Sequence, residues 1–350
     1  MLLMALLALT VFGAACTSGD GETDTETPTE APTSEAEPEI EPSATDPADV
    51  ASRSEETATE EAPVAGGEGE TLASVTEAGT IVCGANTEVP GFGALDENGD
   101  FVGFDTDFCR ALGAAVLGDP AAVEFRPLNS DQRFPALKSG EVDVLIRNTT
   151  WTATRDGSEG ATFLTPNFYD GQGMMVNADA GFTALADMAD TTICVTSGTT
   201  TELNLAARFA RESIAYTPSV FPDNETLQEA YIAEQCDGWT SDKSQLAGIR
   251  SAWPADAGGP ESLVILDETF SKEPLAPVVR DGDSQWAQMV NWTVFALIQA
   301  EEFGVTQANV EEMKTSDNPE ITRFLVSPVA RTTPCSTHRS ASPTRSGPPT

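Results

Sequence analysis

Residues 141–155 read EVDVLIRNTTWTATR, and this stretch indicates both a fold class and a ligand site. Its first part, Val142 to Ile146, is an apolar run that predicts a buried strand. The strand runs into hydrogen-bonding side chains, and Arg147 and Arg155 add two guanidiniums. Arginine grips a carboxylate with two parallel bonds, and open α/β sheets bind ligands beyond the carboxyl ends of their strands. We therefore expect a pocket for a small carboxylate; the alternative is a polar loop whose arginines pair with surface acids.

The sequence on either side of this stretch alternates strands with helices. Before it, the pattern predicts strands at 80–84, 100–104 and 123–125, and helices at 106–117 and from about 131 to Gly140. After it, the pattern predicts strands at 191–195, 216–221, 236–239 and 263–266, and helices at 203–211, 224–234 and 242–251. Asp105, Ser130 with Asp131, and Thr199 with Glu202 are the expected N-terminal caps. Such alternation predicts parallel-type sheets covered by helices.

Two similar α/β units in one chain predict two lobes. We expect the first lobe at 72–171, the second at 172–271, and a return to the first lobe at 272–325, which includes a helix at 284–302. The chain would cross between the lobes near 169–175 and 270–279.

The N-terminal residues predict export and a tether. Residues 1–15 are apolar or small apart from Thr10, and they are too short for a membrane span, so they are typical of a signal peptide. Cys16 follows Gly13, Ala14 and Ala15, as at a bacterial lipoprotein cleavage site, and we expect it to carry lipid; a free cysteine after an ordinary signal is the alternative. Residues 16–71 are acidic and rich in Thr, Pro and Ser, and we expect a disordered linker.

The last segment, residues 326–350, differs in composition from the rest of the chain. It is rich in Ser, Thr, Pro and Arg, contains no acidic residue, and holds His338, the only histidine. We expect it to be disordered, and an out-of-frame origin would explain its composition.

The cysteine positions favour two disulfides in an oxidising compartment. Cys83 and Cys109 fall in the first expected lobe, and Cys194 and Cys236 fall in the second. One bridge within each lobe is the simplest pairing; four reduced, buried cysteines are the alternative. None of the spacings is that of a metal site.

Several function classes find no support in the sequence. The net charge of −38 opposes binding to nucleic acid phosphates. A triad hydrolase needs a base, usually histidine, and the single His338 lies in the tail. No phosphate-binding glycine loop is present, so no cofactor is predicted. Chemistry carried by carboxylates alone stays open.

Several motifs resemble one protein family, the extracytoplasmic solute-binding proteins of polar amino-acid ABC transporters, in particular the general L-amino-acid-binding branch. They run from about Leu72 to Leu325 and include GFDTDFCR at 103–110, RNTTWT at 147–152, YDGQG at 169–173, SGTTTELN at 197–204, SKEPL at 271–275 and AEEFGVTQA at 300–308. The resemblance implies a two-lobe periplasmic-binding-protein fold of type II, the Venus flytrap, with two hinge crossovers. It also implies an amino acid as ligand and permease subunits as partners.

The resemblance also implies roles for particular residues. Arg155 would clamp the ligand α-carboxylate, with Thr200 at a helix N-terminus, and Asp242 would receive the α-ammonium. The remaining ligand-binding positions that we expect are Asn148, Thr150, Arg147, Asn86, Val89 and Phe92. Asp242 could equally cap its own helix, and Arg147 could belong to a structural ion pair.

These observations favour a lipid-anchored binding protein on the outer face of the cell membrane, or in the periplasm, that delivers polar L-amino acids to an ABC importer. Arg147, with Asn148, Thr149 and Thr152 around it, favours glutamate or glutamine over leucine as ligand. The alternative is an enzyme on the same scaffold, a cyclohexadienyl (prephenate or arogenate) dehydratase, which would need an acid–base group. A sensor without transport is a third possibility.

Overall fold

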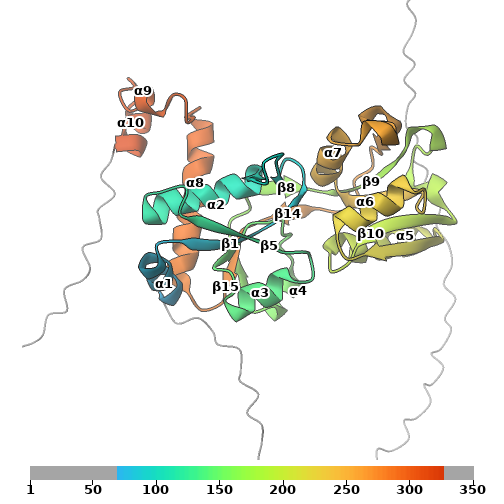
Figure 1. The fold of residues 1–350 in the computed structure, drawn as a ribbon, viewed down its shortest axis with the longest axis horizontal. Coiled ribbons are helices and arrows are strands. Elements are labelled where there is room, and N and C mark those ends of the chain that lie inside the picture. Colours follow the sequence, from blue (N-terminus) through green and yellow to red (C-terminus); the bar gives the residue numbers. More distant parts are fainter. Residues whose placement is uncertain (1–68, 327–350) are drawn as a thin grey trace, which may run out of the picture. The chain divides into compact units, whose positions relative to one another are not determined.

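The computed structural model describes residues 69–326 (Figure 1). The predicted signal peptide, Cys16, almost all of the predicted linker and the tail after Val326 lie outside the described residues. Within the described range, no helix combines the length and the apolar character that crossing a membrane requires.

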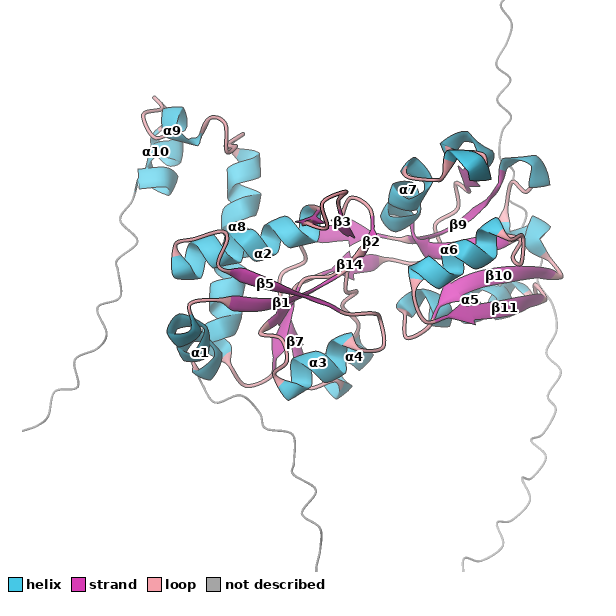
Figure 2. Ribbon diagram, in the orientation of Figure 1, coloured by secondary structure: helices cyan, strands magenta, loops and turns pink. Residues whose placement is uncertain are grey.

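The first lobe is built on a mixed sheet in the order β5-β1-β6-β15-β7, of which Figure 2 labels β5, β1 and β7. β1 pairs in parallel with β5 and β6, whereas β15 runs antiparallel to β6 and β7. Because β15 comes late in the chain, the sheet is complete only after the chain returns from the second lobe. The strands are β1 (Ile81–Ala85), β5 (Val123–Pro127), β6 (Val144–Leu145), β7 (Ala161–Phe163) and β15 (Val278–Arg280).

Helices cover both faces of this sheet because its strands are apolar on both sides. Ile81 and Cys83 of β1 point into a core shared with Leu112 and Trp286, whereas the intervening Val82 packs on the other side against a core that contains Phe134. The first core holds residues of α1 (Glu70–Ala78), α2 (Phe104–Leu117) and α8 (Ser284–Glu302), and the second holds residues of α3 (Arg133–Ser139). Three shorter helices complete this part of the chain: α4 (Ala153–Ser158), α9 (Val310–Met313) and α10 (Pro319–Val326).

The second lobe repeats the architecture on a sheet in the order β11-β10-β12-β9-β13. β10 is parallel to β11 and β12, and β9 is antiparallel to β12 and β13. Helix α5 contributes Phe209 to one core, and helices α6 and α7 contribute Tyr231 and Leu246 to the other. The elements are β9 (Gln172–Asn177), β10 (Thr191–Thr196), α5 (Thr200–Glu212), β11 (Tyr216–Phe221), α6 (Asn224–Ile232), β12 (Gly238–Asp242), α7 (Lys243–Ser251) and β13 (Leu263–Ile265). Its 3-10 turns are η1 (Ala178–Ala180), η2 (Leu185–Met188), η3 (Ala255–Ala257) and η4 (Pro260–Ser262).

The predicted strand at 100–104 does not join the main sheet. It is shortened to β4 (Phe101–Val102), which forms a small antiparallel sheet with β2 (Glu88–Val89) and β3 (Gly93–Leu95). Helix α2 then starts directly after Gly103, which has a φ of 127° and whose Cβ, if present, would lie 2.4 Å from the Phe92 carbonyl oxygen. The glycine therefore holds the N-cap position.

Two of the predicted helix caps differ in the structure. Asp105 lies inside the first turn of α2 rather than at its cap. Helix α3 has Gln132 at its N-cap position, without a capping side-chain bond, instead of Ser130 or Asp131. Thr199 caps α5 as predicted, since its hydroxyl accepts a hydrogen bond from the Glu202 amide at 3.1 Å.

Two segments carry the chain between the lobes, and they pair with each other. β8 (Phe168–Asp170) leads into β9, and β14 (Glu273–Leu275) leads into β15. They form a two-stranded antiparallel ribbon in which Glu273 lies directly opposite Asp170. These are the two crossovers that the sequence predicts.

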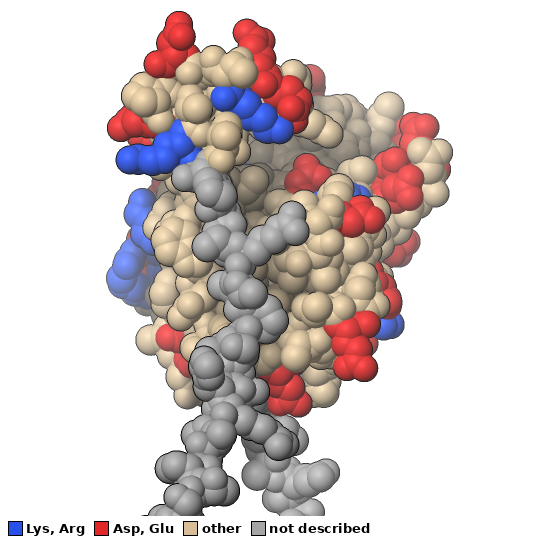
Figure 3. Space-filling view, turned by 90° about the vertical axis from the view of Figure 1, so that its left-hand side faces the viewer, with Lys and Arg blue, Asp and Glu red and all other residues tan. Residues whose placement is uncertain are grey.

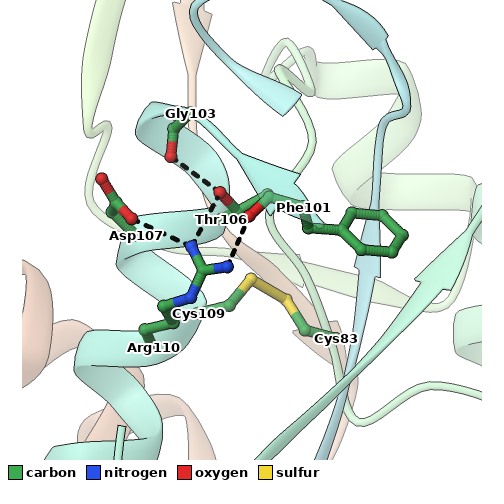
Figure 4. Close-up of polar contacts among 7 residues, drawn as sticks. All are labelled: Cys83, Phe101, Gly103, Thr106, Asp107, Cys109 and Arg110. Carbon is green, nitrogen blue, oxygen red and sulfur yellow. Dashed lines mark hydrogen bonds and ion pairs between the residues drawn. A yellow bond between two sulfur atoms is a disulfide. The ribbon is translucent and has the colours of Figure 1, made fainter. Parts of the chain in front are cut away.

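Each lobe holds the disulfide that the simplest pairing predicts. Cys83 of β1 bonds to Cys109 of α2, with their Cα atoms 6.3 Å apart, and Cys194 of β10 bonds to Cys236, with 5.7 Å between Cα atoms. Figure 4 shows the first bridge beside Arg110, whose guanidinium donates to the Asp107 carboxylate at 3.0 Å and to the Phe101 carbonyl. The disulfide therefore connects α2 to β1, and the Arg110 guanidinium connects α2 to β4.

The surface keeps the acidic character of the sequence. On the face that Figure 3 presents, Asp and Glu side chains are spread widely, and Lys and Arg side chains gather in a few groups. Nothing on this face resembles the continuous basic patch that nucleic acid binding requires.

Candidate functional site

A polar cavity lies between the strand ends of the first lobe and helix N-termini of the second. Hydroxyl, amide, guanidinium and carboxylate groups line it. Seven of the expected ligand-binding residues are among them: Asn86, Arg147, Asn148, Thr150, Arg155, Thr200 and Asp242. The rest of the lining is Ser130, Arg133, Thr196, Thr199, Thr201, Asn224, Ser241 and Gln245.

Arg155 is held rigidly at the cavity. It lies in α4, whose N-cap Thr152 accepts a hydrogen bond from the Arg155 amide at 3.2 Å. The guanidinium stands over the Phe134 ring at 5.5 Å and donates to the Thr150 carbonyl oxygen at 3.0 Å. It also donates across the lobes to the carbonyl oxygen of Gly198 at 3.2 Å. Burial lowers the pKa of Arg155, whereas Glu273 and Asp242 raise it.

Arg133 is a second buried guanidinium at the same end, and sequence reasoning did not single it out. It stands over the same Phe134 ring at 5.4 Å and also donates to the Gly198 carbonyl oxygen, at 3.2 Å. In the described part of the chain, its Nε has no hydrogen-bond partner. One signal was present in the sequence: an arginine in the first turn of a helix is unfavourable for the helix dipole, which suggests a role outside the helix.

The N-terminus of α5 faces these two arginines from the second lobe. The first N–H groups of a helix have no partner inside it and favour an anion. Thr200 and Thr201 occupy this first turn and line the cavity. The Thr200 hydroxyl donates to Glu273 at 2.9 Å and lies 3.4 Å from the Thr150 hydroxyl. Two guanidiniums and a helix N-terminus therefore form a strongly electropositive end.

Asp242 forms the opposite, electronegative end. It takes the N-cap position of α7 but makes no capping bond with its side chain. Its Oδ1 is buried without a hydrogen-bond partner among the described residues. Burial raises the pKa of Asp242 well above its usual range, and Glu273 and Asp170 raise it further, whereas Arg133 and Arg155 lower it. A buried carboxylate oxygen without a donor is costly, so this atom is suited to receive a cationic group.

The hinge ribbon supports both ends of the cavity. Glu273 is 1 % exposed and accepts hydrogen bonds from Thr200 and from the Asn204 amide at 2.8 Å, so it is anchored on α5. Asp170, its cross-strand neighbour, accepts from the Ser244 amide at 3.2 Å at the start of α7. Each hinge carboxylate thus contacts a second-lobe helix that lines the site, Glu273 at α5 and Asp170 at α7.

Arg147 occupies the third side of the cavity. Its guanidinium donates to the Asn86 amide oxygen at 2.8 Å, and its Nε has no hydrogen-bond partner within residues 69–326. Amide bonds continue from there across the lobes: Asn86 donates to Asn148 at 2.7 Å, and Asn148 donates to Gln245 at 3.1 Å. Gln245 then donates to Asn224 at 3.2 Å. Among residues 69–326 no carboxylate forms an ion pair with Arg147.

Asn148 owes its position to the backbone. It has a φ of 37°, in the left-handed region that asparagine tolerates better than most residues. Its backbone N–H donates to the buried Asp105 carboxylate at 2.6 Å. Burial raises the pKa of Asp105 to about 7, although this hydrogen bond and Arg147 lower it, and burial likewise lowers the pKa of Arg147 to about 10.

Some expected residues lie elsewhere. Val89 and Phe92 do not line the cavity; they are buried in an apolar cluster with Leu275, because the short β2–β3 hairpin turns their side chains inward. The hydroxyl of Thr149 donates to the Arg147 carbonyl oxygen, and that of Thr152 caps α4. These two hydroxyls therefore form hydrogen bonds with backbone atoms.

The charge pattern matches a zwitterion. A carboxylate fits the end formed by Arg133, Arg155 and the first turn of α5, and an ammonium fits Asp242. Arg147 also lines the cavity and is used by neither end, so it is available to the side chain of such a ligand. No group of histidine, cysteine or acidic residues within the described part of the chain could hold a metal ion.

Comparison with known proteins gives a consistent picture. The family model of the bacterial extracellular solute-binding proteins, family 3, matches residues 81–308. The general L-amino acid-binding periplasmic protein AapJ of Rhizobium johnstonii is 49 % identical over 255 residues, which is 73 % of this chain and 74 % of AapJ. The glutamate/glutamine/aspartate/asparagine-binding protein BztA of Rhodobacter capsulatus is 48 % identical over 73 % of this chain and 75 % of BztA.

A solved structure is similar over the same part of the chain. An ABC transporter periplasmic binding protein from Brucella ovis, with glutathione bound, is 49 % identical and superposes with a TM-score of 0.69. The match covers 73 % of this chain and 79 % of the Brucella protein. The predicted two-lobe α/β fold is confirmed.

Proposed function

The chain belongs to the bacterial extracellular solute-binding proteins of family 3, and on that premise we propose that it captures polar L-amino acids between its lobes and delivers them to the permease subunits of an ABC importer. AapJ and BztA are both named as amino acid-binding proteins, which supports an amino acid as ligand.

One observation carries the proposal: both charged ends of an amino acid have a buried counterpart. Arg133 and Arg155 donate to the same backbone oxygen of Gly198, so their remaining N–H groups are grouped at one end. Asp242 offers an unpaired oxygen at the other. Charge-assisted bonds in a desolvated site are stronger than neutral ones, which favours a zwitterion over a ligand with one charge.

The mechanism that we propose is lobe closure. The carboxylate site combines Arg155 of the first lobe with Thr200 of the second, so a bound ligand touches both lobes only when they are together. A ligand that binds the closed form better shifts the equilibrium toward it. The hinge ribbon would carry this motion, since Asp170 and Glu273 connect it to α7 and α5.

The family is one of solute-binding proteins, and AapJ, BztA and YhdW of Escherichia coli are all named as binding proteins rather than enzymes. The dehydratase alternative therefore receives no support. A structure 27 % identical to this chain is described as an ancestral amino acid-binding protein and a precursor of cyclohexadienyl dehydratase, and even that description is of a binder. Incubation with prephenate, followed by assay for phenylpyruvate, should give no product.

A thermal-shift screen against the proteinogenic L-amino acids tests the proposal. A ligand at 100 times its Kd adds about 2.7 kcal/mol to the free energy of unfolding, which corresponds to a rise in Tm of roughly 5–10 °C for a domain of this size. Polar L-amino acids should give this shift, and their D-enantiomers and N-acetyl forms should not. The absence of a shift with every L-amino acid would reject the proposal.

Within the polar amino acids we propose a preference for glutamate and glutamine. Arg147 has an unpaired Nε and no ion pair within the described residues, so a ligand carbonyl or carboxylate oxygen would supply a missing acceptor. The name of BztA supports the same class. If leucine stabilises the protein more than glutamate and glutamine at equal concentration, Arg147 has a structural role and this preference is wrong.

We further propose the domain division 72–171, 172–271 and 272–325, an export signal at 1–15, and lipid attachment at Cys16 followed by an acidic tether. This arrangement would hold the binding lobes near a permease on the outer face of the membrane. Metabolic labelling with a fatty acid should mark the full-length protein and not the Cys16→Ser variant. Equal labelling of both proteins would exclude Cys16 as the anchor.

A further inference from the structure

A second cavity adjoins the first on the side of Arg147. The two cavities share Asn86, Ser130, Arg147, Thr196 and Asn224 in their linings. The volume of the second is about 200 Å³, against about 30 Å³ for the first. A cavity needs roughly 10–15 Å³ on this measure to hold one water, so the second has room for a group of several atoms.

The second cavity extends from the buried site to the protein surface. At its inner end, Asn86, Arg147 and Asn224 are buried, whereas Pro127 and Pro222 at its outer end are exposed. For a ligand held by its carboxylate at Arg155 and by its ammonium at Asp242, Arg147 is a lining cation that neither charged end uses, and it lines both cavities. A side chain placed beside Arg147 would therefore face a passage to the surface rather than a closed wall.

The chemistry of the passage changes along its length. Arg147 offers a buried donor at the inner end, Leu128 is apolar, and Asn129 and Gln132 carry amides. Two acids also line the passage: Glu88, which is near enough to Arg147 to raise its pKa, and Asp223. The Glu88 carboxylate accepts hydrogen bonds from the Asn224 amide at 2.9 Å and the Glu225 amide at 3.3 Å, and Asp223 caps α6. The passage thus suits a carbonyl oxygen followed by an extension without a negative charge.

We propose that the protein binds L-glutamine derivatives that are extended at the side-chain amide nitrogen, the γ-glutamyl amides, with the extension in the second cavity. This inference rests on the proposed function, because it requires the zwitterion to be held at Arg155 and Asp242. The γ-carbonyl keeps the position that it has in glutamine, beside Arg147, and the substituent on nitrogen continues outward. Neutral substituents bind better than carboxylates because Glu88 and Asp223 repel a negative charge.

Isothermal titration calorimetry with the full-length protein tests this inference. The probes are L-glutamine, γ-L-glutamylethylamide and glycyl-L-glutamine; the last carries its extension on the α-nitrogen instead. We expect γ-L-glutamylethylamide to bind within about tenfold of glutamine, and glycyl-L-glutamine to show no binding, since its acylated nitrogen cannot form an ion pair with Asp242.

Substitutions that fill the second cavity test whether the extension binds there. Thr87 is half-buried and lines only the second of the two cavities, so Thr87→Trp should fill the passage. It should weaken the binding of γ-L-glutamylethylamide by about 30-fold or more and change the Kd for glutamine by less than about threefold. Thr217→Trp, at an exposed position on β11, is the matched control. Pro222→Trp, at the exposed outer end, is the second variant if Thr87→Trp does not fold.

The outcomes separate the two proposals. Glutamine binding without γ-L-glutamylethylamide binding overturns this inference and leaves the proposed function in place. If the wild-type protein binds neither ligand, both proposals are overturned. Equal binding of γ-L-glutamylethylamide to wild type and to a folded Thr87→Trp or Pro222→Trp variant places the extension elsewhere and also overturns this inference.

Discussion

Replacing Arg155 by alanine should weaken amino acid binding without unfolding the protein. Arg155 is 9 % exposed and stands between the Phe134 ring and two backbone carbonyl oxygens, those of Thr150 and Gly198. In the proposed complex it forms a charge-assisted pair with the ligand carboxylate. Removal of one partner of a buried charge pair costs about 2–5 kcal/mol of binding free energy, a loss of roughly 30-fold to several thousand-fold in affinity.

The structure favours the lower half of that range. Arg133 stands over the same ring and donates to the same Gly198 oxygen, so one guanidinium stays at the carboxylate end after the substitution. The helix N-terminus at Thr200 also stays. We therefore expect Arg155→Ala to cost about 2–3 kcal/mol, or roughly 30- to 150-fold in Kd. The double variant Arg155→Ala with Arg133→Ala should lose more affinity than either single variant.

Calorimetric titration of wild type and variant with the amino acid that gives the largest thermal shift measures the effect. Arg211→Ala is the matched control, because Arg211 lies at the far end of α5 with 66 % of its side chain exposed. It should leave Kd unchanged. A Kd within about fivefold of wild type for Arg155→Ala, in a protein with a native circular dichroism spectrum, would refute the carboxylate assignment.

Three further predictions follow from the site and its surroundings. Because burial and neighbouring acids raise the pKa of Asp242, binding of an ammonium should release a proton and weaken as pH falls; calorimetry in buffers of different ionisation enthalpy should detect this release in wild type and not in Asp242→Asn. Gly198→Ala should weaken binding, since the new Cβ would lie 2.0 Å from an Asp131 oxygen of the other lobe, whereas Gly79→Ala, at a similar φ with no atom within 4 Å, should not. Burial raises the pKa of Asp105 to about 7, above its value of about 4 in the unfolded chain, so the contribution of its protonation to stability is fully present below about pH 4 and is lost as pH rises through 7; urea titrations should show that Asp105→Asn loses less stability across this range than wild type.

The sequence predicted the architecture where local patterns and packing agree. The strand and helix rhythm, the α5 cap at Thr199 and the glycine that ends α3 all depend on residues close in the chain. The disulfide pairs followed from assigning each cysteine to a lobe. Helix α1 was missed for the opposite reason: its first amides at Gly69 and Thr71 are bound by the Asp283 carboxylate, more than 200 residues away in the sequence.

The candidate site was predicted only in part, and the missing residues share a cause. Arg155, Asp242 and Thr200 came from motifs, and the structure places them at one cavity. Arg133 was missed because nothing in the local sequence shows that its guanidinium reaches Gly198 of the other lobe, 65 residues away. Asn224 was noticed only as the start of a helix, although its side chain ends the amide chain that begins at Arg147.

The hinge acids show most clearly what only the three-dimensional structure provides. Asp170 and Glu273 are about 100 residues apart, yet they lie opposite each other in the ribbon, where like charges are unfavourable. Each is tolerated because it has its own donors, Ser244 at α7 and Asn204 with Thr200 at α5. Both raise the pKa of Asp242, so the ribbon that joins the lobes also increases the electronegativity of the ammonium end. An ammonium bound there would favour ionisation of Asp242 beside these two acids, so the charges of the hinge ribbon contribute to the free energy of binding at this end.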